Sequence, residues 1–199
     1  MSESMTVGAA AGDVYQAQGY LSPIRIMSEA GAGQLADKIA GIYDDHGVEA
    51  KGLLGSNAHL IFPELFDLVC NPAILDRVEE VLGPDILCWS AAFFSKPAHD
   101  PSFVSWHQDL TYWGLEPADI ITAWVALTPS TKESGCMRVV PGTHNEGQLG
   151  HSDTYVAENL LSRGQVLDVQ VDEDEAVDLI LRPGEMSLHH VLVVHGSEP

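Results

Sequence analysis

The chain has 199 residues, of which 45% are apolar, so it can form one domain with a real core but is too short for two ordinary ones. Its 9 Lys and Arg against 29 Asp and Glu give a formal charge of −20. A surface this acidic repels phosphate backbones and anionic lipid headgroups, which argues against nucleic-acid and membrane partners. The three cysteines are odd in number and far apart, and the first residues lack the basic and apolar segments of a secretory signal. We therefore expect a cytoplasmic protein.

The first residues of the chain are small and polar. Residues 1–15 are therefore expected to form a flexible tail. The remainder, residues 16–199, is expected to form a single domain whose N-terminal part is helical.

Two helices are predicted by their end signals. Ser28 can cap a helix whose apolar residues recur on one face, and Gly47 can end it. Asn71-Pro72 forms an N-cap and first-turn pair, and Gly83 provides the stop of the second helix.

After residue 84 the pattern changes to short apolar runs separated by turn residues, which predicts strands. The predicted strands lie at 86–95, 120–128, 136–140, 166–171, 177–181 and 186–195. No helix of useful length alternates with them, so a parallel doubly wound sheet is disfavoured. The spacing instead favours a mainly β fold, an antiparallel sandwich or barrel such as a jelly roll, with the N-terminal helices packed on one sheet.

A candidate metal site begins at His107-Gln108-Asp109. Residues two apart share one face of a strand, so His107 and Asp109 can converge on one ion. His195 ends the last apolar run and can complete the set if the fold brings strand ends together. Two His and one carboxylate leave coordination positions open, which suits non-haem Fe(II). The same residues also occur on ordinary polar strand faces, and nine His offer other partners, so both interpretations stay open.

Longer segments carry a resemblance to a known family. The segments WHQDLTYWGLEP, SGCMRVVPGTH and RPGEMSLHHVLVVHGSEP, within residues 86–199, resemble the phytanoyl-CoA dioxygenase family of Fe(II)- and 2-oxoglutarate-dependent oxygenases. The fold of that family is a double-stranded β-helix, a jelly roll of the cupin kind. The resemblance therefore implies the same mainly β class as the strand pattern.

The resemblance also implies roles for five residues. It makes His107, Asp109 and His195 the iron ligands, Trp124 a wall of the co-substrate pocket, and Ser197 a contact of the distal 2-oxoglutarate carboxylate. The implied cofactors are Fe(II), 2-oxoglutarate and O₂. The implied reaction is hydroxylation of a C–H bond in a small-molecule substrate, with succinate and CO₂ as co-products. Some relatives halogenate with a small residue at the carboxylate position, so Asp109 favours hydroxylation.

One expected feature is missing. The family places an Arg shortly after this Ser to grip the distal carboxylate, whereas the sequence ends at Pro199. We therefore expect a C-terminally incomplete domain that lacks one strand, and we expect Arg138 to pair with a surface carboxylate rather than replace the anchor. Two alternatives remain: a non-catalytic or incomplete metal-binding member of the fold, and a Zn²⁺-dependent hydrolase. The sequence does not predict the oligomeric state.

Other residues near these motifs have less specific interpretations. His189 shares a face with His195 in a straight strand, and a supporting or core role is favoured over metal ligation. His144 is expected in a turn or at the rim of the site, and His99 and His151 in solvated loops. The segment 110–119 is the best candidate for a lid.

Overall fold

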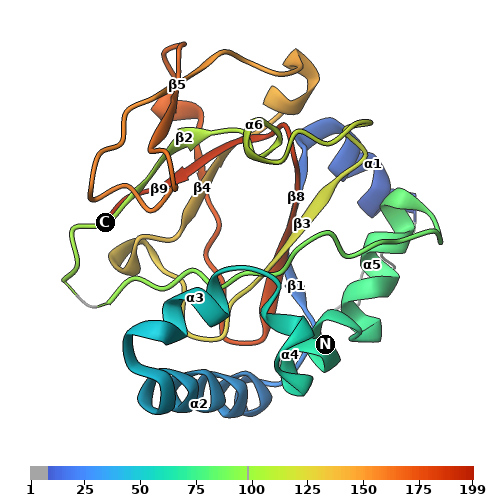
Figure 1. The fold of residues 1–199 in the computed structure, drawn as a ribbon. Helices are drawn as coiled ribbons and strands as arrows, with labels where there is room; N and C mark the ends of the chain where they lie inside the picture. Colours follow the sequence, from blue (N-terminus) through green and yellow to red (C-terminus); the bar gives the residue numbers. More distant parts are fainter. Residues whose placement is uncertain (1–8, 98) are drawn as a thin grey trace.

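Two antiparallel sheets face each other and form the body of the molecule (Figure 1). The computed structural model describes residues 9–97 and 99–199. One sheet has the order β1–β8–β3 and the other β2–β9–β4–β7, with β5–β6 as a separate pair. The strands are β1 (Tyr20–Arg25), β2 (Val104–His107), β3 (Ile121–Val125), β4 (Met137–Val140), β5 (His151–Asp153), β6 (Gln165–Leu167), β7 (Val177–Asp178), β8 (Glu185–His190) and β9 (Val194–Ser197). This arrangement confirms the predicted jelly-roll class.

Most of the helices lie on the outer side of the first sheet or below the sheets in the view of Figure 1, whereas one short helix lies at their upper end. They are α1 (Ala9–Gln18), α2 (Glu29–His46), α3 (Ala50–Gly55), α4 (Pro63–Val69), α5 (Pro72–Leu82) and the short α6 (Leu110–Trp113). Both predicted helices are confirmed with their caps. The Ser28 side chain accepts from the backbone at the start of α2, and Asn71 does the same for α5. Gly47 and Gly83 end them with positive φ, a conformation that glycine adopts without strain. None of the helices in the described part of the chain combines the length and apolar character that a bilayer-crossing segment needs.

The expected N-terminal tail is wrong from residue 9 onward. Residues 9–15 belong to α1, and Tyr15 is only 2% exposed within the main hydrophobic cluster. Burying this aromatic side chain stabilises a helix whose small residues gave no amphipathic signal. The rest of the expected tail, residues 1–8, lies outside the described residues.

Two of the strand predictions need correction. The run 186–195 is two strands, because the chain turns within the apolar residues 191–193, which are buried although they are not typical turn formers. Residues 86–95 form no strand, since no neighbouring strand pairs with their backbone, and Leu87 and Trp89 are exposed. The other predicted runs contain strands that are shorter than expected.

Strand alternation decides what each face of the first sheet contacts. Met186 and Leu188 of β8 point outward and are fully buried against Ile74 and Val78 of α5. The residues between them on β8 and β3 point inward, toward the second sheet. The space between the sheets holds a smaller apolar cluster from both of them: Tyr20, Trp124, Met137, Val139 and Leu179.

Candidate metal centre

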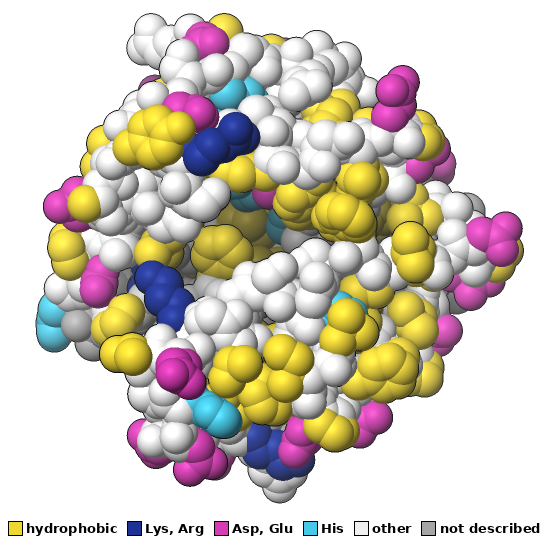
Figure 2. Space-filling model, viewed as in Figure 1, with side chains coloured by type: hydrophobic (Ala, Val, Ile, Leu, Met, Phe, Trp, Pro, Cys, Tyr) yellow, Lys and Arg dark blue, Asp and Glu magenta, His cyan; other side chains and the backbone are white. Residues whose placement is uncertain are grey.

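Two histidines lie opposite each other on neighbouring strands of the second sheet. His107 of β2 pairs directly with His195 of β9, and their ring centroids are 4.1 Å apart. Directly opposed residues in an antiparallel ladder share a face, so both imidazoles project into the space between the sheets. Histidine side chains are visible at the bottom of a hollow on the face shown in Figure 2.

The same backbone contact orients both rings. His107 Nδ1 lies 2.9 Å from the carbonyl oxygen of Ser105, and His195 Nδ1 lies 3.0 Å from that of Val193. A carbonyl only accepts, so each Nδ1 carries the proton and each Nε2 keeps its lone pair. A histidine held through its other nitrogen in this way is the usual arrangement of a metal ligand.

Asp109 supplies the third donor. Its Oδ1 lies 3.5 Å from His107 Nε2 and 3.7 Å from His195 Nε2. The strand ends at His107, and Asp109 has helical dihedral angles at the start of α6, so the two do not share one strand as the sequence suggested. One ligand atom from each of the three residues lies within 4.8 Å of the others, a grouping found nowhere else in residues 9–97 and 99–199.

The protonation states suit metal binding. Burial, reinforced by the neighbouring His107, lowers the pKa of His195 to about 3, so its imidazole is neutral at pH 7. Burial would raise the pKa of Asp109, but the neighbouring His195, His107 and His189 hold it well below its ordinary value. A neutral imidazole and an ionised carboxylate are the forms that bind metal. Two nitrogen donors and one carboxylate oxygen, with positions left open, fit Fe(II).

Gln108, between the two ligands, ties this turn to two other segments. Its side chain is fully buried and donates to the carbonyl oxygens of Gly147 at 2.9 Å and Leu192 at 2.8 Å. Its Oε1 accepts from Leu149 N at 2.8 Å, and its backbone N–H donates to His151 Nε2 at 3.0 Å. The expectation of a solvated loop for His151 is therefore wrong. These contacts join residues that are 39 to 84 positions apart, so no local signal in the sequence marked them.

The glycine of His195-Gly196-Ser197 allows β9 to lie close to β2. A Cβ added to Gly196 would lie 2.9 Å from the Val104 carbonyl oxygen and 3.3 Å from the Trp106 ring. Neither neighbour is free to move, because one is backbone and the other a large ring. The glycine therefore keeps the two histidine-bearing strands at ladder distance.

The comparison with protein families matches the model of the phytanoyl-CoA dioxygenases, named PhyH, to residues 15–199. The chain belongs to the phytanoyl-CoA dioxygenase family. This confirms the resemblance carried by its sequence motifs.

Its relatives include proteins that are named as dioxygenases. It is 33% identical over 139 residues to the peroxisomal phytanoyl-CoA dioxygenase of Homo sapiens, an alignment that covers 67% of this chain and 41% of that protein. It is 30% identical over 146 residues to a probable alpha-ketoglutarate-dependent hypophosphite dioxygenase of Stutzerimonas stutzeri, covering 72% of this chain and 50% of that protein. The chain thus spans about half the length of the curated relatives it matches. Among solved structures, the non-heme monooxygenase ThoJ superposes with a TM-score of 0.83 at 33% identity, covering 94% of this chain and 70% of that one.

Trp124 and Ser197, the two co-substrate residues implied by the family, both reach the space between the sheets. Trp124 of β3 packs against the apolar cluster there, beside Met137 and Val139 of β4. Ser197 follows His195 by two residues in β9, and so lies on the same face of the strand.

Lys96 contacts Ser197, a feature that the sequence interpretation missed. Its Nζ donates to Ser197 Oγ at 2.8 Å and to the Gly135 carbonyl oxygen at 3.1 Å, and it also contacts the Glu198 carbonyl. Burial lowers the pKa of this lysine. Lys96 directly follows the segment 86–95 that was wrongly predicted as a strand, and nothing in its local sequence distinguishes it.

The other histidines singled out in the sequence and the predicted lid differ in their surroundings. His144 sits in a turn as predicted but is buried, with Nε2 3.0 Å from the Gln16 carbonyl oxygen, and His99 is exposed. Within the segment 110–119, Tyr112 packs edge-on against the His107 ring at 5.9 Å. The structure thus gives this aromatic residue a packing contact with a candidate ligand.

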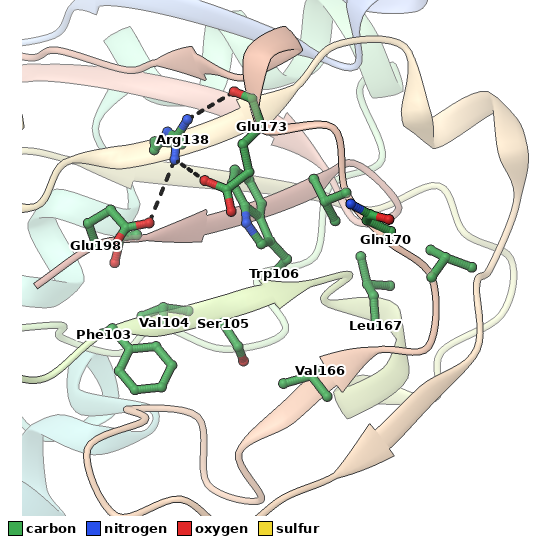
Figure 3. A pocket seen from close by; sticks show the side chains of 13 residues that line it. Phe103, Val104, Ser105, Trp106, Arg138, Val166, Leu167, Gln170, Glu173 and Glu198 are labelled. Carbon is green, nitrogen blue, oxygen red and sulfur yellow. Dashed lines mark hydrogen bonds and ion pairs between the residues drawn. The ribbon is translucent and has the colours of Figure 1, made fainter.

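A separate groove lies on the outer face of β2, β9 and β4, with a volume of about 410 Å³ (Figure 3). Arg138 lies at its edge, 2.9 Å from Glu173 and 3.6 Å from Asp178, with its guanidinium 5.3 Å from the centre of the Trp106 ring. The expected surface ion pair of Arg138 is therefore confirmed. Arg138 of β4 pairs with Gly196 of β9, the residue next to His195. Because alternate residues of a strand point to opposite faces, Arg138 lies on the outer face of the sheet and His195 on the inner face.

Proposed function

We propose that this chain carries the catalytic centre of an Fe(II)- and 2-oxoglutarate-dependent oxygenase that hydroxylates a C–H bond of a small molecule. The observation that carries the proposal is the grouping of His107 Nε2, His195 Nε2 and one oxygen of Asp109, all within 4.8 Å of one another. The names of several relatives support it, since they include a phytanoyl-CoA dioxygenase, an alpha-ketoglutarate-dependent dioxygenase and an L-proline trans-4-hydroxylase.

The three residues would hold the metal from one side. His107 and His195 are nitrogen donors with oriented rings, and Asp109 adds the negative charge that favours a divalent cation. When bound, the ion would supply O₂ activation coupled to decarboxylation of 2-oxoglutarate, which yields succinate and CO₂. The protein's own contribution is to leave the remaining coordination positions open and to keep bulk water away from them.

Ser197 and Lys96 are suited to the distal carboxylate of 2-oxoglutarate. Two residues along a strand span about 6.6 Å, so Ser197 lies at a distance from His195 that a short dicarboxylate can bridge. The Lys96 ammonium contacts the Ser197 hydroxyl and can form a charge-assisted hydrogen bond with a carboxylate placed there. Trp124 would form an apolar wall beside it. In this proposal, Lys96 supplies the positive charge for the distal carboxylate, a role that the family resemblance assigns to an arginine after Ser197.

The test is succinate formation by the purified chain supplied with Fe(II), 2-oxoglutarate, O₂ and ascorbate, which provides the two electrons that a C–H substrate would otherwise supply. We expect succinate and CO₂ in equal amounts, no product when Fe(II), 2-oxoglutarate or O₂ is omitted, and none from His107→Ala. Zn²⁺ should suppress the reaction because it does not support redox chemistry. Oxygen-independent, zinc-stimulated hydrolysis would instead indicate a hydrolase. Metal binding without any decarboxylation would indicate a non-catalytic member of the fold.

A further inference from the structure

The two oxygens of Asp109 have different neighbours. Oδ1 faces the histidine ligands, 3.5 Å from His107 Nε2 and 3.7 Å from His195 Nε2. Oδ2 faces the opposite sheet, where the Thr122 hydroxyl donates to it at 3.1 Å and His189 Nε2 lies 3.7 Å away. The carboxylate therefore bridges the two sheets, with one oxygen directed to each.

Thr122 and His189 are a matched pair. They are direct partners in the ladder between β3 and β8, so they share the inner face of the first sheet. His189 is 2% exposed, and its Nδ1 has no hydrogen-bond partner in the described part of the chain. A buried imidazole without other polar contacts is costly. The Asp109 carboxylate is the polar group that lies near this ring, so His189 contributes more than core packing.

We propose that Thr122 and His189 are positioning residues that hold Oδ2 of Asp109, so that the carboxylate offers a bound metal ion only one oxygen. The inference rests on the proposed function, because it concerns the same metal site. A carboxylate that binds through both oxygens occupies an additional coordination position. The co-substrate and O₂ need all the positions that the three protein ligands leave open. Holding Oδ2 away from the ion would keep one of these positions free.

His189 could alternatively be a fourth metal ligand. The geometry favours the positioning role, because the group whose ligand atoms lie within 4.8 Å of one another contains His107, Asp109 and His195 but not His189. The two roles predict different results. Loss of a ligand removes the metal, whereas loss of a positioning residue retains the metal and changes how the carboxylate binds it.

Four variants test the proposal, in two pairs. Thr122→Val keeps the side-chain shape but removes the hydroxyl, and Thr122→Ser restores it. His189→Leu removes the imidazole N–H, and His189→Gln restores a donor. His190→Gln is the matched control, because His190 is the next residue of β8 and points to the opposite face. Circular dichroism and thermal unfolding of the metal-free proteins establish that each variant folds.

The measurements are anaerobic Fe(II) binding, 2-oxoglutarate binding to the Fe(II)-loaded protein by calorimetry, and the Asp109 coordination mode by crystallography. We expect Thr122→Val and His189→Leu to bind one Fe(II) with affinity within about tenfold of wild type. Their 2-oxoglutarate affinity should fall about 10–100-fold, with both Asp109 oxygens on the metal. Thr122→Ser, His189→Gln and the control should stay close to wild type.

Three results separate the possible failures. Unchanged 2-oxoglutarate affinity with a single coordinating oxygen in Thr122→Val and His189→Leu would overturn the positioning role. Complete loss of Fe(II) from His189→Gln, as in His107→Ala, would make His189 a ligand and also overturn it. A wild-type chain that binds no Fe(II) would refute the proposed function itself.

Discussion

The two sheets that enclose the metal centre use the same strand alternation for different purposes. In the helix-backed sheet β1–β8–β3, outward residues such as Leu188 are buried under helices, and the inward residues include the polar Thr122 and His189. In the ligand-bearing sheet β2–β9–β4–β7, the inward residues include His107 and His195, while Arg138 lies on the outer face among surface carboxylates. The first sheet therefore packs against the helices, and the second presents both candidate histidine ligands. We expect substitutions to separate these two functions.

The largest expected effect follows from removing a ligand. His107→Ala should abolish Fe(II) binding and metal-dependent succinate formation, because two donors do not hold the ion in an open site. Its circular dichroism spectrum should match that of wild type, since the helix-backed core is untouched. Full activity in this variant, or in Asp109→Ala, would show that the metal lies elsewhere.

A substitution in the helix-backed sheet should have the opposite effect: it should lower stability and leave metal binding unchanged. Leu188 is 0% exposed and packs toward the helices, so Leu188→Ala should lower the free energy of unfolding by about 2–5 kcal/mol. Urea denaturation of the metal-free protein measures this loss. Fe(II) affinity under native conditions should stay at the wild-type value. A large loss of metal affinity in the folded variant would mean that the two sheets are not separable in this way.

A third substitution examines the co-substrate end of the ligand-bearing sheet. Lys96→Met removes a charge-assisted hydrogen bond, which contributes about 1.5–3 kcal/mol, so 2-oxoglutarate should bind about 10–100-fold more weakly. Lys96→Arg keeps the charge and should retain most of the affinity. Fe(II) binding should not change in either variant. Equal 2-oxoglutarate affinity in wild type and Lys96→Met would exclude Lys96 from the co-substrate site.

The contact between β2 and β9 can be tested with a single methyl group. Gly196→Ala places a Cβ against the Val104 carbonyl oxygen and should cost about 1–3 kcal/mol in stability. It should also weaken Fe(II) binding by moving His195 away from His107. Gly33→Ala is the control, because a Cβ there meets nothing within 4 Å, and alanine is favoured inside a helix by about 0.5–1 kcal/mol. Stability changes of the same sign in both variants would contradict the steric account.

The smallest effect concerns pH and the outer side of β8. Burial, followed by the nearby His144, lowers the pKa of His190 below its ordinary value, while Asp119 opposes this. The unfolded chain therefore takes up a proton that the folded chain resists. Neutral His190 therefore contributes to the free energy of unfolding above about pH 6.5, and this contribution is lost as the pH falls. The unfolding free energy should fall less between pH 7 and pH 5 in His190→Gln than in wild type, as measured by urea denaturation. Parallel pH profiles would contradict this assignment.

Local signals in the sequence predicted the elements whose ends are determined locally. The predictions of the two capped helices are correct because the Ser28 and Asn71 side chains accept hydrogen bonds from backbone groups only two or three residues away. Residues 86–95 have the composition of a strand but lack a paired neighbour, and pairing is not a local property. The turn at 191–193 escaped notice because its residues are apolar and buried.

The residues of the candidate site also divide into those that the sequence could predict and those that it could not. His107, Asp109 and His195 could be proposed from residue type, spacing and family resemblance, and the structure brings them together. Lys96 and Thr122 could not be proposed from the sequence, because no motif distinguishes either of them and the fold alone brings them to the site. Lys96 contacts Ser197 across 101 residues of sequence, a proximity that only the fold creates.

The most direct test is a crystal structure of the chain loaded anaerobically with Fe(II) and 2-oxoglutarate. The account predicts one iron at about 2 Å from His107 Nε2, His195 Nε2 and Asp109 Oδ1, with Oδ2 still on Thr122 and the distal carboxylate beside Lys96 and Ser197. Iron bound away from these three residues, for example at the carboxylates of the outer groove, would contradict it.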